Sequence, residues 1–350
     1  MGIEEGVVPP PYHLFFSYKH IRVLYTFLVI RYRSRAGLSP HYLLFDDIFT
    51  SPQPTVLFYT MLNIFFLSTV LFAASTLAYP QPVPENSSHG LTHKHLSPQG
   101  RKAGLSGYIG IQSTPAFAQL APQLSWYSDY TPNTPSSHGL KGVSMLWGAS
   151  GSSCGSVVDD RLATFKKMVK KGNVPDIVFG FYEPDCSCPS SSDMTVAEGA
   201  ADWNALLAPL AKNHGTILGS PSMCKQYDED YLTPFKAQIS RPWDVTAVHI
   251  NKPNLAEAKK DIEYYVQKYK KPIWVAEFAC VHDQPSWQPC TDQGEIDTFI
   301  RDVVKYFEGN KHVVAYGPSN GEGLGDVWPL TKDGKLTASG KTYLAAVKGL

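Results

Sequence analysis

Two glutamates carry the strongest chemical signal in this sequence. Glu183 lies in the segment FYEPD, and Glu277 lies in the segment WVAEF. Each follows an apolar run rich in aromatic and β-branched residues, which is typical of a strand. Two carboxylates held across a sugar-sized cleft can act as general acid and nucleophile in glycoside hydrolysis. The alternative is structural: Glu183 would sit at a helix N-terminus, and Glu277 would be the buried partner of a lysine or arginine.

A histidine and several aromatic residues are further candidates for the site. His249 ends a predicted strand, where it would either orient Glu277 and bind sugar or be a hydrogen-bonded core histidine. Aromatic rings pack against the flat apolar faces of sugars. Trp274, three residues before Glu277, is expected in the core. We expect stacking platforms from five residues: Trp126, Tyr127, Trp147, Tyr316 and Trp328.

The elements that must position these residues alternate along the chain. Short apolar runs predict strands, and longer amphipathic runs predict helices, an order typical of parallel βα units. Eight strands within roughly 250 residues fit a TIM barrel, so we predict an α/β fold with a (β/α)₈ barrel over 105–350. A doubly wound open sheet is the alternative, but no glycine-rich phosphate turn follows the first strand. The predicted strands are 106–111, 124–127, 143–147, 177–181, 216–219, 245–250, 273–278 and 313–316, and the predicted helices include 159–171, 195–213, 254–270 and 292–308.

The chain before residue 105 is expected to contain a targeting segment and a flexible linker that leads into this domain. An apolar stretch followed by small residues predicts a signal peptide at 61–78, with 1–60 as an unstructured upstream extension of the gene model. The alternative is a membrane anchor at 55–74 with a cytoplasmic tail. Residues 79–104 are expected to form a flexible linker that carries a glycosylation sequon at Asn86. We therefore expect a secreted or cell-wall protein, or, with an uncleaved anchor, a type II membrane protein.

Cysteine content and charge narrow the function further. Six cysteines suit up to three disulfides in an oxidising compartment, with Cys280–Cys290 the favoured pair and the other pairings open. A zinc site at Cys186 and Cys188 is the alternative, but one intervening residue is fewer than zinc sites usually have. The chain has 31 basic and 31 acidic residues, which favours a neutral ligand over nucleic acid. We expect a monomer that needs neither a metal nor an organic cofactor.

Several segments together resemble glycoside hydrolase family 128. They are LSWY at 124–127, MLWG at 145–148, GFYEPD at 180–185, GSP at 219–221, AVH at 247–249 and KPIWVAEFA at 271–279. The resemblance implies an endo-acting retaining hydrolase of β-1,3-glucan, with Glu183 as acid/base and Glu277 as nucleophile.

Two departures from the family pattern bear on that activity. Tyr182 replaces an asparagine that in the family contacts the sugar 2-hydroxyl, and Ile250-Asn251 replace an aromatic pair. Tyr182 is therefore expected to contact substrate in place of the asparagine. Two alternatives stay open: a non-catalytic β-glucan-binding barrel, and a hydrolase of a different glycan.

Overall fold

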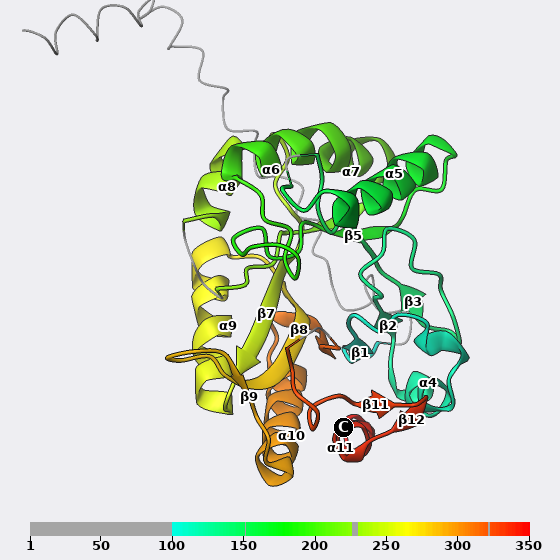
Figure 1. Ribbon diagram of the computed structural model, residues 1–350, viewed down its shortest axis with the longest axis vertical. Helices are drawn as coiled ribbons and strands as arrows, with labels where there is room; N and C mark the ends of the chain where they lie inside the picture. The colour runs from blue at the N-terminus through cyan, green and yellow to red at the C-terminus, as the bar shows by residue number, and fades with distance from the viewer. Residues whose placement is uncertain (1–99, 151, 226–229, 321–322) are drawn as a thin grey trace, which may run out of the picture. The chain divides into compact units, whose positions relative to one another are not determined.

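The computed structural model describes residues 100–350 except 151, 226–229 and 321–322 (Figure 1). The predicted signal peptide, the anchor, the upstream extension, the sequon and nearly all of the linker lie outside these residues. The part that is described falls in one compact unit. Within it, no helix combines the length and the apolar character that crossing a bilayer demands.

Parallel strands form the centre of the fold. They pair in three groups, β1-β2-β3, β4-β5-β6 and β7-β8-β10, and every pairing within these groups is parallel. The strands are β1 (Gly104–Leu105), β2 (Trp126–Tyr127), β3 (Lys141–Gly142), β4 (Ser144–Met145), β5 (Ile177–Phe179), β6 (Ile217–Gly219), β7 (Thr246–Lys252), β8 (Ile273–His282) and β10 (Val313–Pro318).

Single bridges and a shared chain segment link the three groups. Ala103 pairs in parallel with Tyr316, which joins the β1 end to β10, and Gly219 pairs in parallel with Val245, which joins β6 to the start of β7. Only Val143 separates β3 from β4. The fold is therefore α/β, built on parallel pairing.

The predicted strand positions overlap or adjoin the observed ones, and the first is the least accurate. The expected strand at 106–111 is replaced by β1 at Gly104–Leu105. Gly107 and Gly110 both have positive φ, so the chain turns where the prediction extended it. Ile109, expected within that strand, is instead 71% exposed.

Eight α-helices lie among the described residues, and the four predicted helical segments are confirmed. Side-chain caps define the starts of two of these segments: Asn254 accepts from the Glu257 amide, and Asp292 accepts from the Glu295 amide. The predicted 195–213 segment corresponds to α6, a π-helical turn at Trp203–Leu207 and α7, which ends one residue later. The helices are α4 (Pro115–Leu120), α5 (Ser156–Lys170), α6 (Val196–Asp202), α7 (Ala208–His214), α8 (Leu232–Gln238), α9 (Leu255–Tyr269), α10 (Gln293–Gly309) and α11 (Ala338–Lys348).

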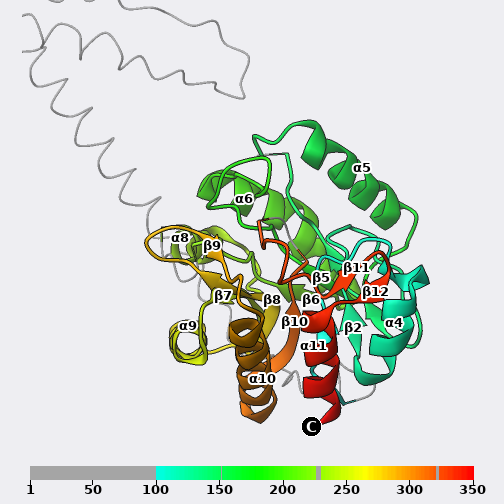
Figure 2. The ribbon, with the colours of Figure 1, turned by 60° about the horizontal axis from the view of Figure 1, so that its bottom comes forward.

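Helices cover the strands on their outer side, and aromatic rings fill the space within. In Figure 2, α9, α10 and α11 stand side by side outside β7, β8 and β10. The Trp126 ring packs edge-on against the Trp274 ring at 4.9 Å between centroids, and Phe179 contacts both. Gly104 makes room for Trp126, since a Cβ there would lie 2.2 Å from the indole.

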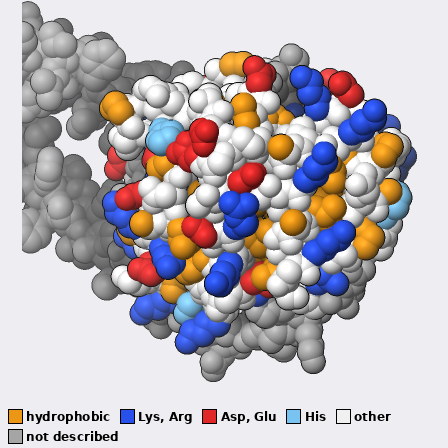
Figure 3. All heavy atoms as spheres, turned by 90° about the horizontal axis from the view of Figure 1, so that it is seen from below, with side chains coloured by type: hydrophobic (Ala, Val, Ile, Leu, Met, Phe, Trp, Pro, Cys, Tyr) orange, Lys and Arg blue, Asp and Glu red, His pale blue; other side chains and the backbone are white. Residues whose placement is uncertain are grey.

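Two small antiparallel elements complete the structure. β9 (Gln288–Pro289) folds back on β8, and β11 (Thr331–Lys332) pairs with β12 (Lys335–Leu336) ahead of α11. On the face seen in Figure 3, acidic and basic side chains both occur, as the zero net charge leads one to expect.

Candidate active site

Disulfides join the loops that follow the central strands. Cys154–Cys188 ties the loop after β4 to the loop after β5, and Cys186–Cys224 ties the latter to the loop after β6. Cys280–Cys290 closes the β8–β9 hairpin, which confirms that predicted pairing. Both cysteines of the proposed zinc alternative therefore pair with other cysteines.

Glu183 follows β5 in an unusual backbone conformation. Its φ is 48°, in the left-handed region that non-glycine residues rarely adopt. The neighbouring backbone holds it there, because the Tyr182 amide donates to the Trp147 carbonyl and the Glu183 amide donates to the Ser222 carbonyl, each at 2.9 Å. Glu183 Oε2 accepts a 2.7 Å hydrogen bond from Ser191, and the side chain is 13% exposed.

Glu277 lies inside β8 and is surrounded by donors. Its Oε2 accepts from the hydroxyls of Tyr130 at 2.5 Å, Ser319 at 3.0 Å and Tyr182 at 3.2 Å. Its Oε1 accepts from the Asn251 side-chain amide at 3.1 Å. An ionised carboxylate offers about two lone-pair directions on each oxygen, so the three donors at Oε2 fully occupy that oxygen. The side chain is only 4% exposed.

His249 stands between the two glutamates. Its Nδ1 lies 2.8 Å from Glu183 Oε1 and 3.3 Å from Glu277 Oε1. His249 pairs with Glu277 across β7 and β8, just after an irregularity in the strand register. One N–H therefore links two carboxylates that come from strands far apart in the sequence.

The protonation states follow from burial and from these contacts. Burial alone would raise the pKa of Glu277, but the charge of His249 and the hydrogen bonds from Tyr130, Asn251 and Ser319 outweigh it and hold the pKa below the usual value. Burial would lower the pKa of His249, but Glu277 and Glu183 raise it above its usual value. The site thus favours a carboxylate at Glu277 beside a protonated imidazole.

The two tyrosines stay neutral. Burial, followed by the charge of Glu277, raises the pKa of Tyr130 well above its usual value. Burial, followed by the charges of Glu183 and Glu277, does the same for Tyr182. Both phenols therefore remain protonated and can donate to the Glu277 carboxylate.

Among the described residues, Glu183, His249 and Glu277 form one of two groups that could hold a metal ion. Each offers one ligand atom, and these atoms lie within 4.8 Å of one another. However, the 2.8 Å contact from Nδ1 to Glu183 is a hydrogen-bond distance, so a metal would have to displace the proton that His249 shares. A second group, Cys280, Cys290 and Glu295, has its two sulfurs joined in a disulfide.

The structure brings four of the predicted residues into contact: Glu183, Glu277, Tyr182 and His249. Trp147 adjoins them, because its ring stacks on Tyr182 at 5.9 Å between centroids and 13° between planes. The Arg161 guanidinium lies 4.6 Å from the centre of the same indole. Trp147 is 4% exposed, so in this conformation it supports Tyr182 and offers a ligand little surface.

The other four predicted platforms require correction. A sugar can stack only on a ring face that it can reach, and all four residues are 0% exposed: Trp126, Tyr127, Tyr316 and Trp328. Trp126 is a core residue. Trp328 serves the site indirectly, because its indole N–H donates to the Ser319 carbonyl at 2.9 Å and so helps to fix a residue that contacts Glu277.

Three contacting residues were missed from the sequence, and Asn251 was noted only as a departure from the family pattern. Asn251 had a usable signal, since it lies two residues after His249 on the same strand and therefore on the same face. Ser319 directly follows β10, another position where strand-end residues converge. Tyr130 and Ser191 lie in loops and follow no periodic pattern.

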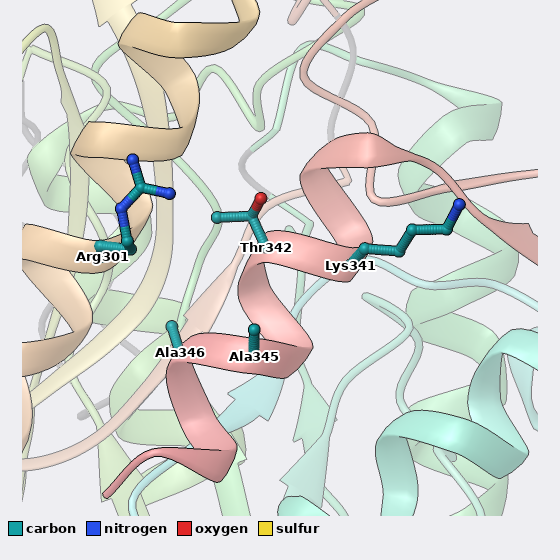
Figure 4. A pocket seen from close by; sticks show the side chains of 5 residues that line it. All are labelled: Arg301, Lys341, Thr342, Ala345 and Ala346. Carbon is teal, nitrogen blue, oxygen red and sulfur yellow. The ribbon is translucent and has the colours of Figure 1, made fainter.

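A separate pocket lies between α10 and α11. Arg301 comes from α10, while Lys341, Thr342, Ala345 and Ala346 come from α11 (Figure 4). Its lining includes neither a carboxylate nor an aromatic ring. It therefore lacks the groups that glycoside chemistry requires.

Comparison with known sequences gives the family. The sequence model described as "Glycosyl hydrolase catalytic core" matches residues 106–343, which is most of the chain. The chain belongs to this glycosyl hydrolase family. The matched region contains Glu183, His249 and Glu277.

Solved structures confirm the resemblance to glycoside hydrolase family 128. Two subgroup VII oligosaccharide-binding proteins are each 44% identical: one from Trichoderma gamsii (TM-score 0.66, covering 73% of this chain and 96% of that chain), and one from Cryptococcus neoformans (0.65, 71% and 94%). A subgroup II endo-β-1,3-glucanase from Sorangium cellulosum is 23% identical (0.53, 70% and 98%) and shares the fold.

A curated relative points to the same family of proteins. Alkali-sensitive linkage protein 1 of Schizosaccharomyces pombe is 31% identical over 180 residues, which are 48% of this chain and 32% of that protein. The match thus spans about a third of the relative's length.

Proposed function

We propose that this protein binds β-1,3-glucan oligosaccharides beside Glu183 and Glu277, and that it hydrolyses them slowly or not at all. The observation that carries this proposal is the crowding of Glu277, whose Oε2 accepts three hydrogen bonds and whose Oε1 accepts one from Asn251 and lies 3.3 Å from His249 Nδ1. A nucleophile must turn an oxygen lone pair toward the anomeric carbon, and each oxygen of Glu277 is already approached by at least as many donors as it has lone pairs.

The position of Tyr182 also supports binding with little or no hydrolysis. Tyr182 stands where the resemblance places an asparagine that contacts the sugar 2-hydroxyl, yet its own hydroxyl is directed at Glu277. Its ring is packed among Tyr130, Trp147 and His249. The two subgroup VII structures, which are named as oligosaccharide-binding proteins, support the same function through 44% identity.

Retaining hydrolysis is the second candidate, favoured by the distance between the acids. Atoms of Glu183 and Glu277 lie within 4.8 Å, close to the roughly 5–5.5 Å of retaining enzymes and short of the spacing in inverting ones. Glu183 would donate its proton to the glycosidic oxygen while Glu277 attacks the anomeric carbon and expels the leaving sugar. Water, deprotonated by Glu183, would then cleave the glycosyl-enzyme ester with retained configuration.

Two broader expectations belong with this proposal. The order β1-β2-β3, β4-β5-β6, β7-β8-β10 and the bridges between these groups support closure into a (β/α)₈ barrel, with β3 and β4 as two parts of one strand. Three disulfides support folding in an oxidising compartment, consistent with secretion to the cell wall.

Binding and turnover should be measured side by side. Calorimetry with laminarihexaose should detect binding, while reducing-sugar release should stay far below the 1–10³ s⁻¹ of typical enzymes. Tyr182→Asn should raise reducing-sugar release, because it removes one of the three donors at Glu277 Oε2 and restores an amide. Tyr182→Phe is the matched control, since it removes the same donor without supplying the amide.

The outcomes separate the candidates. If the protein releases reducing sugar at ordinary enzymatic rates, and if Glu277→Gln abolishes this release, retaining hydrolysis replaces binding as the proposed function. Neither binding nor release with β-1,3-glucan would reject both candidates for this substrate.

A further inference from the structure

Trp287 is the most exposed tryptophan described. Its side chain is 45% exposed, whereas Trp126, Trp203, Trp243, Trp274 and Trp328 are all below 2%. Single exposed apolar side chains are common, but a ring of this size offers a flat apolar face that a ligand can cover with a gain in free energy. The ring is therefore a candidate contact surface.

The ring is fixed in place. It lies between β8 and β9, where Val281 pairs with Pro289, and the Cys280–Cys290 disulfide closes the base of the hairpin. Its indole N–H donates to the Gly323 carbonyl at 2.8 Å. A ring held in this way loses little further conformational freedom when a ligand packs on it.

The hairpin and the loop after β10 connect this ring to the glutamate pair. Glu277 and Trp287 belong to the same β8–β9 hairpin, and His282, five residues past Glu277, ends β8 about 17 Å along the strand. Ser319 contacts Glu277, and four residues later Gly323 contacts Trp287, a span of at most about 14 Å of backbone. Trp287 therefore lies on the side where the strands end, at a distance that an extended oligosaccharide can bridge.

The surroundings of the ring suit a sugar. Its chain neighbours Ser286 and Gln288 are exposed and polar and hydrogen-bond each other, so the indole is an isolated apolar face that the apolar face of a pyranose can cover. The four buried aromatics predicted from the sequence cannot serve this role.

We propose that Trp287 is a stacking platform for a distal sugar residue of a β-1,3-glucan chain whose other end lies at Glu183 and Glu277. This inference rests on the proposed function and adds a subsite to it. A long oligosaccharide reaches both places, whereas a short one is held at the glutamates alone.

The test compares two ligand lengths on full-length protein. Trp287→Ala should weaken laminarihexaose binding about tenfold while changing laminaritriose affinity less than twofold, and Trp287→Phe should recover most of the loss. Leu350→Ala is the control, because it removes another exposed apolar side chain, 61% exposed, and should change neither affinity. Melting temperatures check that each variant is folded.

The possible failures are distinguishable. Unchanged laminarihexaose affinity in Trp287→Ala, or equal losses for both ligands, would overturn the platform while the proposed binding function stands. If the unaltered protein binds neither ligand, the proposed function fails and the platform fails with it.

Discussion

Two buried acids, Glu277 and Asp261, contact residues on opposite faces of β7 and are stabilised by different kinds of partner. Asn251 and Lys252 are consecutive, so their side chains point to opposite faces of the strand. Asn251 donates to Glu277 in the site. Lys252 forms ion pairs with Asp261 on α9 at 3.3 Å and with Asp283 in the hairpin at 2.6 Å. One acid thus has several hydrogen-bond donors, and the other has a single lysine.

The outcome for the pKa differs accordingly. Burial raises the pKa of Asp261 to about 6, and the nearby Lys252 charge only partly opposes it. Neither oxygen of Asp261 accepts a well-oriented hydrogen bond. Glu277 is almost as deeply buried, yet its donors and His249 bring its pKa below the usual value. The charge of a protonated imidazole together with several directed hydrogen bonds therefore opposes desolvation more effectively than one ammonium group does.

The largest effect should come from removing the lysine. Lys252→Met removes the ion pair of Asp261, and we expect a loss of about 3–5 kcal/mol in the free energy of unfolding, as when one partner of a buried pair is deleted. Urea denaturation measures this. In the control, Lys252→Met combined with Asp261→Leu removes both charges and should regain more than half of the loss. A loss below about 1 kcal/mol would show that water, not Lys252, compensates Asp261.

A smaller effect should follow from removing one donor at Glu277. Tyr130→Phe deletes the 2.5 Å hydrogen bond, and hydrogen bonds to charged groups contribute about 1.5–3 kcal/mol. The pKa of Glu277 should rise at the same time, which carboxyl titration by NMR can follow. Tyr306→Phe is the control, since that hydroxyl contacts Asn310 instead of a carboxylate. An unmoved Glu277 pKa would mean that the remaining donors suffice.

The sequence was sufficient for the parallel α/β fold and for the choice of the two glutamates as candidates. Glu183 and Glu277 each end or interrupt an apolar run that predicts a strand. Parallel strands place their C-terminal ends on the same side of the fold, which brings the two residues together. The contact between them through His249 follows from the same rule. The family resemblance is confirmed by the matched region and by the solved structures.

The aromatic residues show where sequence reasoning fails. Parallel strands are apolar on both faces, so the pattern around Trp126 or Tyr316 does not reveal which ring meets solvent. Trp287 escaped notice for the opposite reason, because it lies in a polar hairpin outside any apolar run. Tyr130 adopts φ 61° in a loop, and only tertiary structure turns its hydroxyl toward Glu277.

The smallest effect concerns pH and isolates Asp261. Its folded pKa, about 6, lies above the usual 3.8, so the folded state binds this proton more tightly than the unfolded state does. The stabilisation is complete below the usual value and is lost as pH rises through about 6. Between about pH 5 and 7 the unaltered protein should therefore lose about 1 kcal/mol more unfolding free energy than Asp261→Asn. The comparison cancels His249, whose raised pKa acts in the same direction in both proteins. If the unaltered protein instead gains stability relative to Asp261→Asn over this range, Lys252 compensates Asp261 fully, and the contrast between the two sides of β7 disappears.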